Sequence, residues 1–230
     1  MITLAIDTAT KSAGVALLDD ERILAEYFFD LSVNHSETVL PAVHRSLERS
    51  GIGIAGVGLI ALTVGPGSFT GLRIGASTVN GLALAAGTPV VGVSTLEALA
   101  YNAAGFAGVI CPLLDARKDE VYAGLYRSDG EGRLESLMEE RVATPGEILP
   151  QIACDALFLG NGVKTAAGLI AARPKGLSHF LPPNLQSVRA SSVALVGRGK
   201  HKRGEALDLT TFVPRYLRRS EAEIRLGEKA

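Results

Sequence analysis

A glycine-rich segment, residues 65–71 (GPGSFTG), is the part of the sequence best suited to contact an anion. It lies between a predicted strand and a predicted helix. Glycine lets backbone N–H groups approach an anion, and a helix N-terminus adds partial positive charge. The segment lacks the lysine of a P-loop, and a strand-to-helix corner that only glycine can turn explains it equally well, so both interpretations stay open. The candidate anion-binding residues are Gly65, Gly67, Ser68, Gly71 and Arg73.

The end of the first predicted strand is a second candidate site. Asp7 closes that strand, and Thr8 follows it. A carboxylate in this position can hold hydrated Mg²⁺, and a hydroxyl can contact a phosphate. A carboxylate at a tight turn also commonly caps backbone N–H groups. We therefore treat Asp7 and Thr8 as nucleotide- or anion-binding candidates, with capping as the alternative.

Metal-binding and hydrolytic patterns are missing from the sequence. The four histidines show no pair with the i, i+4 spacing of a helical zinc site, so we predict no metal site. Serine, histidine and aspartate residues are too scattered to indicate a catalytic triad, so we predict no catalytic residues.

The predicted elements that position these residues follow one plan twice: a three-stranded meander, a helix, a strand and a helix. Antiparallel strands mixed with βα units predict an α/β fold, with mixed sheets flanked by helices. A duplicated unit of this kind is the architecture of the actin/Hsp70-like group. The predicted parts are an N-terminal actin-like lobe (1–105), a C-terminal actin-like lobe (106–213) and a C-terminal helical tail (214–230). The predicted strands are 2–6, 13–18, 23–29, 58–64, 90–93, 109–114, 120–126, 134–143 and 156–159, and the predicted helices are 34–50, 72–86, 95–104, 145–152, 163–172 and 187–199.

Composition and charge restrict the class of function. The 230 residues are 47% apolar, which fits a folded globular protein, and a formal net charge of −1 gives no basic excess for direct binding of a nucleic acid. The N-terminus does not resemble a signal peptide, and no apolar run is long enough to span a membrane. Cys111 and Cys154 lie in apolar runs and are expected to be buried and reduced. We expect a cytoplasmic protein.

The predicted helix 72–86 is apolar around most of its circumference, and Arg73 is its only charge. Such a helix should be covered on all sides. Its own sheet can cover one side, so the other side needs either a second chain or burial between the lobes. Together with the helix 34–50, it forms the candidate partner interface. The candidate interface residues are Val39, Leu40, Val43, Leu47, Ile74, Gly75, Ala76, Val79, Leu82 and Ala83.

The segment 65–75 (GPGSFTGLRIG) resembles the signature of the bacterial TsaB (YeaZ) family. Residues 4–10, 35–41, 114–122 and 214–223 resemble other parts of that family, so the resemblance runs nearly end to end. It implies an actin/Hsp70-type fold and a role in making threonylcarbamoyladenosine next to the tRNA anticodon.

The resemblance also implies partners. A TsaB protein pairs with the related catalytic subunit TsaD, the small ATPase TsaE joins them, and the first-lobe helices form a homodimer when TsaD is absent. The chain would then meet tRNA only indirectly and would not contact a membrane. No cofactor is firmly predicted for the chain itself, although ATP or ADP could bind at the partner interface or in the TsaD subunit.

One difference from TsaD bears on catalysis. TsaD-type proteins carry a metal-binding His-x-x-x-His after the strand that corresponds to residues 90–93, and the equivalent positions here are Thr95 and Leu99. Leucine cannot ligate a metal, and a threonine hydroxyl is a poor transition-metal ligand. This difference favours a non-catalytic scaffold or activating subunit. The alternative is an ATP-dependent enzyme of the same fold, such as a small-molecule kinase with Asp7 and Asp115 as its acidic pair, or a peptidase.

Overall fold

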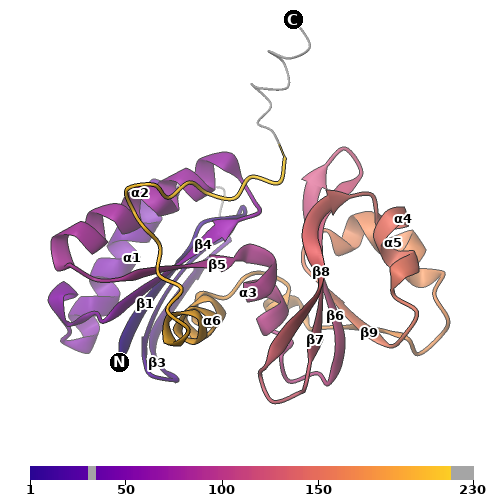
Figure 1. Cartoon of the computed structure of the whole chain (residues 1–230), viewed down its shortest axis with the longest axis horizontal. Helices are drawn as coiled ribbons and strands as arrows, with labels where there is room; N and C mark the ends of the chain where they lie inside the picture. The colour runs from indigo at the N-terminus through magenta and orange to yellow at the C-terminus, as the bar shows by residue number, and fades with distance from the viewer. Residues whose placement is uncertain (31–34, 219–230) are drawn as a thin grey trace, which may run out of the picture.

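The computed structural model describes residues 1–30 and 35–218, which form two lobes built on five-stranded sheets (Figure 1). The first sheet consists of β1 (Ile2–Asp7), β2 (Ala13–Asp19), β3 (Arg22–Phe29), β4 (Leu59–Gly65) and β5 (Val90–Ser94). The second consists of β6 (Gly108–Arg117), β7 (Glu120–Ser128), β8 (Leu134–Ala143), β9 (Ala156–Leu159) and β10 (Ser178–Phe180). The helices are α1 (His35–Ser50), α2 (Phe69–Ala86), α3 (Thr95–Tyr101), α4 (Pro145–Ile148), α5 (Val163–Ala171) and α6 (Ala190–Lys202), with short 3₁₀ turns at Ile54–Gly56, Leu149–Gln151 and Pro183–Leu185.

The two sheets share one topology. Their strand orders are β3-β2-β1-β4-β5 and β8-β7-β6-β9-β10. In each sheet the first three strands form an antiparallel meander, and the last two run parallel to the first strand. β4 is an almost unbroken apolar run and is buried along its length, as expected for a parallel strand covered on both faces. The predicted duplicated, actin/Hsp70-like α/β fold is confirmed.

Three apolar cores separate the layers. α1 and α2 cover the outer face of the first sheet, where Leu4, Ile6 and Leu62 are fully or almost fully buried. α4 and α5 cover the outer face of the second sheet around Phe158. α3 and α6 lie between the two sheets, and the central core that surrounds them includes side chains from both lobes (Figure 1).

The two inner helices are exchanged between the lobes. α3 follows the first sheet in the sequence but packs extensively on β6 and β7, whereas α6 follows the second sheet and packs on β1, β2, β4 and β5. Gly197 of α6 approaches the first sheet so closely that a Cβ there would overlap Ala61. The sequence predicts residues 106–213 as one C-terminal lobe. In the structure α6 completes the core of the first lobe instead, because its apolar face meets that sheet.

Several element boundaries differ from the prediction. α2 begins at Phe69 rather than at residue 72, because the Ser68 side chain accepts a hydrogen bond from Gly71 N–H and caps the helix three residues earlier. The three-residue strand β10 was not predicted. Of the predicted helical tail, residues 214–218 are extended or bent rather than helical, and the remainder lies outside the described residues.

Candidate functional site

The glycine-rich segment packs tightly against the turn that follows β1. A Cβ at Gly67 would overlap the carbonyl oxygen of Ala9, and a Cβ at Gly71 would overlap that of Thr8. The Ser68 N–H donates to the Ala9 carbonyl at 2.7 Å. Close backbone contact within the chain therefore accounts for the glycines at 67 and 71, which supports the corner interpretation of this segment.

Asp7 and Thr8 are buried inside this contact. One oxygen of Asp7 accepts hydrogen bonds from the Ala9 N–H at 3.1 Å and the Thr63 hydroxyl at 2.8 Å. The Thr8 hydroxyl donates to the Gly71 carbonyl at 2.8 Å. Burial raises the pKa of Asp7 to about 6, against the effect of these hydrogen bonds. Both side chains therefore hold the turn to the glycine-rich segment, and neither is exposed to a ligand.

Arg73 points to the C-terminal part of the chain rather than to the glycines. Its Nε donates to the Tyr216 hydroxyl at 3.2 Å, and its guanidinium lies 5.8 Å from the ring centroid of Phe69. Gly65 lies beneath the backbone of Arg215, with φ at +118°. Of the seven predicted nucleotide- or anion-binding residues, two, Gly67 and Ser68, line the cavity described next.

That cavity has a volume of about 370 Å³ and lies between the lobes. The turn after β1 supplies Lys11, the end of β6 supplies Arg117, and the C-terminal segment supplies Arg218. The side chains of Thr10, Ser68, Thr70 and Asn161 add hydrogen-bonding groups, and Asp115 is the one carboxylate in the lining. The excess of cations suits a small anion.

The duplicated order of elements in the sequence already indicates where this cavity lies. The β1–β2 and β6–β7 turns occupy equivalent places in the duplicated plan, so they face each other across the lobes. Arg117, Lys118 and Asp119 all have positive φ, an unusual conformation for consecutive residues other than glycine. Comparing the two copies would have brought these two turns together, and with them Lys11 and Arg117, which line the same cavity.

The described residues contain no group of three or more His, Cys, Asp and Glu side chains able to hold a metal ion. Thr95 and Leu99, the positions predicted to replace the histidines of TsaD-type proteins, are fully buried, and Leu99 belongs to the central core. Substituting donors there would place them among apolar side chains rather than in the cavity.

The predicted partner interface divides into buried and accessible residues. α2 lies on the outside of the first lobe, so its predicted alternative, burial between the lobes, is wrong (Figure 1). Leu40 is 52% exposed, and Leu84, which was not predicted, is 80% exposed. Half-buried candidates are Leu47, Ile74, Ala76 and Leu82. Val39, Val43, Gly75, Val79 and Ala83 are buried within this chain, so they cannot also contact a partner while the lobe stays folded.

Comparisons with known proteins give the family. Residues 30–226 match the family model described as TsaD, tRNA N6-adenosine threonylcarbamoyltransferase. The chain is 37% identical to the tRNA threonylcarbamoyladenosine biosynthesis protein TsaB of Bacillus subtilis, over 97% of this chain and 96% of the relative. The chain belongs to the TsaB (YeaZ) family. It is also 38% identical to TsaB of Escherichia coli, over 70% of this chain and 72% of that protein.

Solved structures agree with this family. YeaZ from Pseudomonas aeruginosa is 31% identical and superposes with a TM-score of 0.81, covering 94% of this TsaB-family chain and 99% of that one. The activator of 2-hydroxyisocaproyl-CoA dehydratase from Clostridium difficile, at 12% identity and a TM-score of 0.51, shares the fold alone. The resemblance stated from the sequence is confirmed. In the described residues, none of the helices is both long and apolar enough to cross a membrane.

Proposed function

We propose that this TsaB-family chain is a non-catalytic subunit in tRNA threonylcarbamoyladenosine biosynthesis. It pairs with a TsaD-like catalytic paralogue, joined by a TsaE-like ATPase, and supports threonylcarbamoyl transfer to the adenosine next to the anticodon. On its own it forms a homodimer through the same surface. The family relationship supports the pathway, since the curated relatives of B. subtilis and E. coli carry this role in their names.

The observation that best supports pairing with a TsaD-like subunit is the outer side of α2, which carries no charged residue after Arg73. Ser77, Gly81 and Ala85 are exposed and four residues apart, so they form a stripe of small side chains along the helix. Leu84 lies beside this stripe, and a Cβ at Gly81 would meet no other atom within 4 Å. From Ile74 to Ala86 the helix carries no charged residue. Small residues let a foreign helix approach closely, and an exposed leucine then buries its apolar surface.

The non-catalytic role rests on what the candidate site offers. A kinase would need acidic side chains that face a nucleotide together. Asp115 lines the inter-lobe cavity, whereas Asp7 is buried under the glycine-rich segment and does not line it. For a peptidase, a histidine should lie in a site that can hold a substrate. His179 pairs with Asp155 at 2.6 Å on the exposed surface of the second lobe, and neither residue lines the inter-lobe cavity. Neither alternative gains support.

Exposed leucines on the two lobes allow a matched experiment. We would express the chain with the TsaD-like paralogue of the same organism and introduce Leu84→Glu, Leu40→Asp or both. Leu169→Asp is the control, because Leu169 is 48% exposed on α5, an outer helix of the other lobe. Circular dichroism confirms folding, and size exclusion measures pairing and self-association.

The proposal expects the Leu40/Leu84 double variant to stay folded and to lose both the heterodimer and the homodimer, while the Leu169 control keeps both. A charge buried in an interface without a partner costs several kcal/mol, on the order of a thousandfold in affinity. The tRNA of a strain that carries only the double variant should lack threonylcarbamoyladenosine. Full pairing and full modification with the double variant would place the partner surface elsewhere.

A further inference from the structure

The chain beyond α6 runs along the first lobe before it turns to the second. We call residues 205–218 the C-terminal strap; it is the yellow trace that rises from α6 to α2 in Figure 1. The Leu207 N–H donates to Val90 O at 2.8 Å, and the Arg215 N–H donates to Val64 O at 2.7 Å. Its apolar side chains, Leu207, Leu209 and Phe212, pack on the outer core of the first lobe. The strap is therefore fixed to the first lobe over most of its length.

The last four described residues of the strap include side chains that contact each lobe. The Tyr216 ring stacks on Phe69 of the first lobe, with centroids 4.0 Å apart and planes 3° apart. In the second lobe, Arg215 pairs with Glu140 of β8 at 2.8 Å. Arg218 donates to the Ala116 carbonyl and pairs with Glu120 at 3.3 Å. Consecutive side chains thus connect the two lobes beside the inter-lobe cavity.

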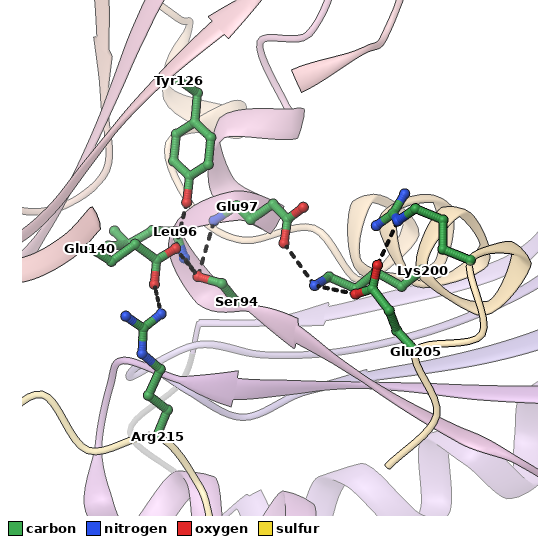
Figure 2. Close-up of polar contacts among 9 residues, drawn as sticks. Ser94, Leu96, Glu97, Tyr126, Glu140, Lys200, Glu205 and Arg215 are labelled. Atoms are coloured by element: carbon green, nitrogen blue, oxygen red, sulfur yellow. Dashed lines mark hydrogen bonds and ion pairs between the residues drawn. The ribbon is translucent and has the colours of Figure 1, made fainter. Parts of the chain in front are cut away.

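Glu140 is the meeting point of three parts of the molecule (Figure 2). Its side chain is only 6% exposed. One carboxylate oxygen accepts hydrogen bonds from the Tyr126 hydroxyl of the second lobe, at 2.5 Å, and from the Ser94 hydroxyl of the first lobe. The other oxygen accepts from the Arg215 guanidinium at 2.8 Å. A buried carboxylate is stable only while such partners remain in place.

The start of the strap is held by a second polar contact between the exchanged helices. Lys200 of α6 lies 3.6 Å from Glu97 of α3 and 3.3 Å from Glu205, where the strap begins (Figure 2). The strap is therefore anchored at its start between the lobes and at its end across the cavity.

We propose that the C-terminal strap clamps the two lobes at one relative orientation. Two-lobed proteins commonly open and close around a hinge. Here an opening would pull Glu140 away from Ser94 or Arg215 and would separate Tyr216 from Phe69. The lobes of this chain therefore move as one body, and the cavity between them keeps one width. This clamp is independent of the proposed pairing with a TsaD-like subunit.

Distance measurements between spin labels test the clamp in the full chain. Cys154 is exposed on the second lobe, and Glu48→Cys adds a label at an exposed position of α1 on the first lobe. Cys111 is buried and stays unlabelled in the folded protein. We expect a single narrow distance distribution for the otherwise unchanged chain.

Two strap variants and one control distinguish loss of the clamp between the lobes from a general loss of stability. Arg215→Ala removes the cation from Glu140, and Tyr216→Leu removes the ring stack without leaving a buried charge. Arg127→Ala is the control, because Arg127 pairs with Glu135 at 3.9 Å on the surface of a single lobe. Each strap variant should broaden the distribution or add a second distance, and the control should not. If Arg215→Ala fails to fold, the double change Glu140→Gln with Arg215→Leu avoids the unpaired charge and carries the same expectation. Narrow, unshifted distributions in folded strap variants would overturn the clamp.

Discussion

The Thr63 hydroxyl of β4 donates a 2.8 Å hydrogen bond to one carboxylate oxygen of Asp7 at the end of β1, the neighbouring strand. Among the described residues, the second oxygen of Asp7 has no hydrogen-bond donor. Burial raises the pKa of this carboxyl from 3.8 to about 6. Hydrogen bonds thus offset only part of the cost of burying this carboxylate in the first lobe.

The pKa of Asp7 predicts how stability depends on pH. The unfolded chain releases this proton near pH 3.8, and the folded chain releases it near pH 6. Between these values the folded state binds more protons, so the free energy of unfolding falls as pH rises, by up to ~3 kcal/mol for this group. Asp7→Asn removes the titration. We expect the variant to be about 1–3 kcal/mol more stable than the parent at pH 8 and equal to it at pH 4. Urea unfolding at both values measures this, and a variant that loses more stability at pH 8 than at pH 4 would contradict it.

Two glycines of α2 should respond in opposite ways to alanine. A Cβ at Gly71 would overlap the Thr8 carbonyl, so Gly71→Ala should destabilise the protein by about 1–3 kcal/mol. Gly81 is exposed with open space around it, so Gly81→Ala should stabilise the helix by about 0.5–1 kcal/mol. Urea midpoints of the two variants decide this. Equal effects would show that the glycine-rich segment does not press on the turn after β1.

ATP should bind weakly or not at all to the isolated chain. Asp7 is buried away from the inter-lobe cavity, and the guanidinium of Arg218 already pairs with Glu120. Lys11 is exposed at the rim. Among the described lining residues Asp115 is the one carboxylate, so Mg²⁺ would lack a pair of acidic ligands there. Calorimetric titration with MgATP should show no saturable heat at micromolar concentrations. A dissociation constant in the low micromolar range that weakens in Lys11→Ala would reverse this prediction.

The two cysteines should differ in reactivity. Burial raises the pKa of Cys111 to about 12, so its thiolate is scarce at neutral pH. Cys154 was also predicted to be buried, and this was wrong, because it is exposed in the structure. A thiol reagent should therefore modify one cysteine in the folded chain and two in urea. Cys154→Ser should remove the fast reaction. Two equally fast thiols under native conditions would mean that the second sheet opens readily.

Hydrophobic periodicity was sufficient to predict most elements of this fold, because long amphipathic or apolar segments such as β4 and α2 carry strong patterns. β10 was missed since three residues are too short for any period. The start of α2 was misplaced because Gly71 reads as part of a loop, while the cap at Ser68 depends on a side-chain hydrogen bond.

The candidate site was harder to predict than the fold. A helical pattern shows that Val39 and Leu40 are both apolar, but it does not say which one faces the sheet; the structure buries Val39 and exposes Leu40. Asp7 has the residue type of a nucleotide ligand, and only the packing of the glycine-rich segment over it reveals the capping role. The cavity cations come from three distant parts of the chain and become neighbours only after folding.

Because α3 and α6 are exchanged between the lobes, the first lobe cannot complete its core until most of the chain has been synthesised. When the first sheet and its two outer helices have left the ribosome, most of the inner face of that sheet is still uncovered. α3 can contact only β4 and β5, and α6, which covers the rest, ends at Lys202. The apolar residues of this inner face, including Ala61, Val91 and Val93, must wait for most of the chain to be translated. The amino-terminal half therefore emerges as an unfinished domain that needs protection from aggregation. A messenger truncated anywhere before the α6 codons would yield a product that cannot close its own core.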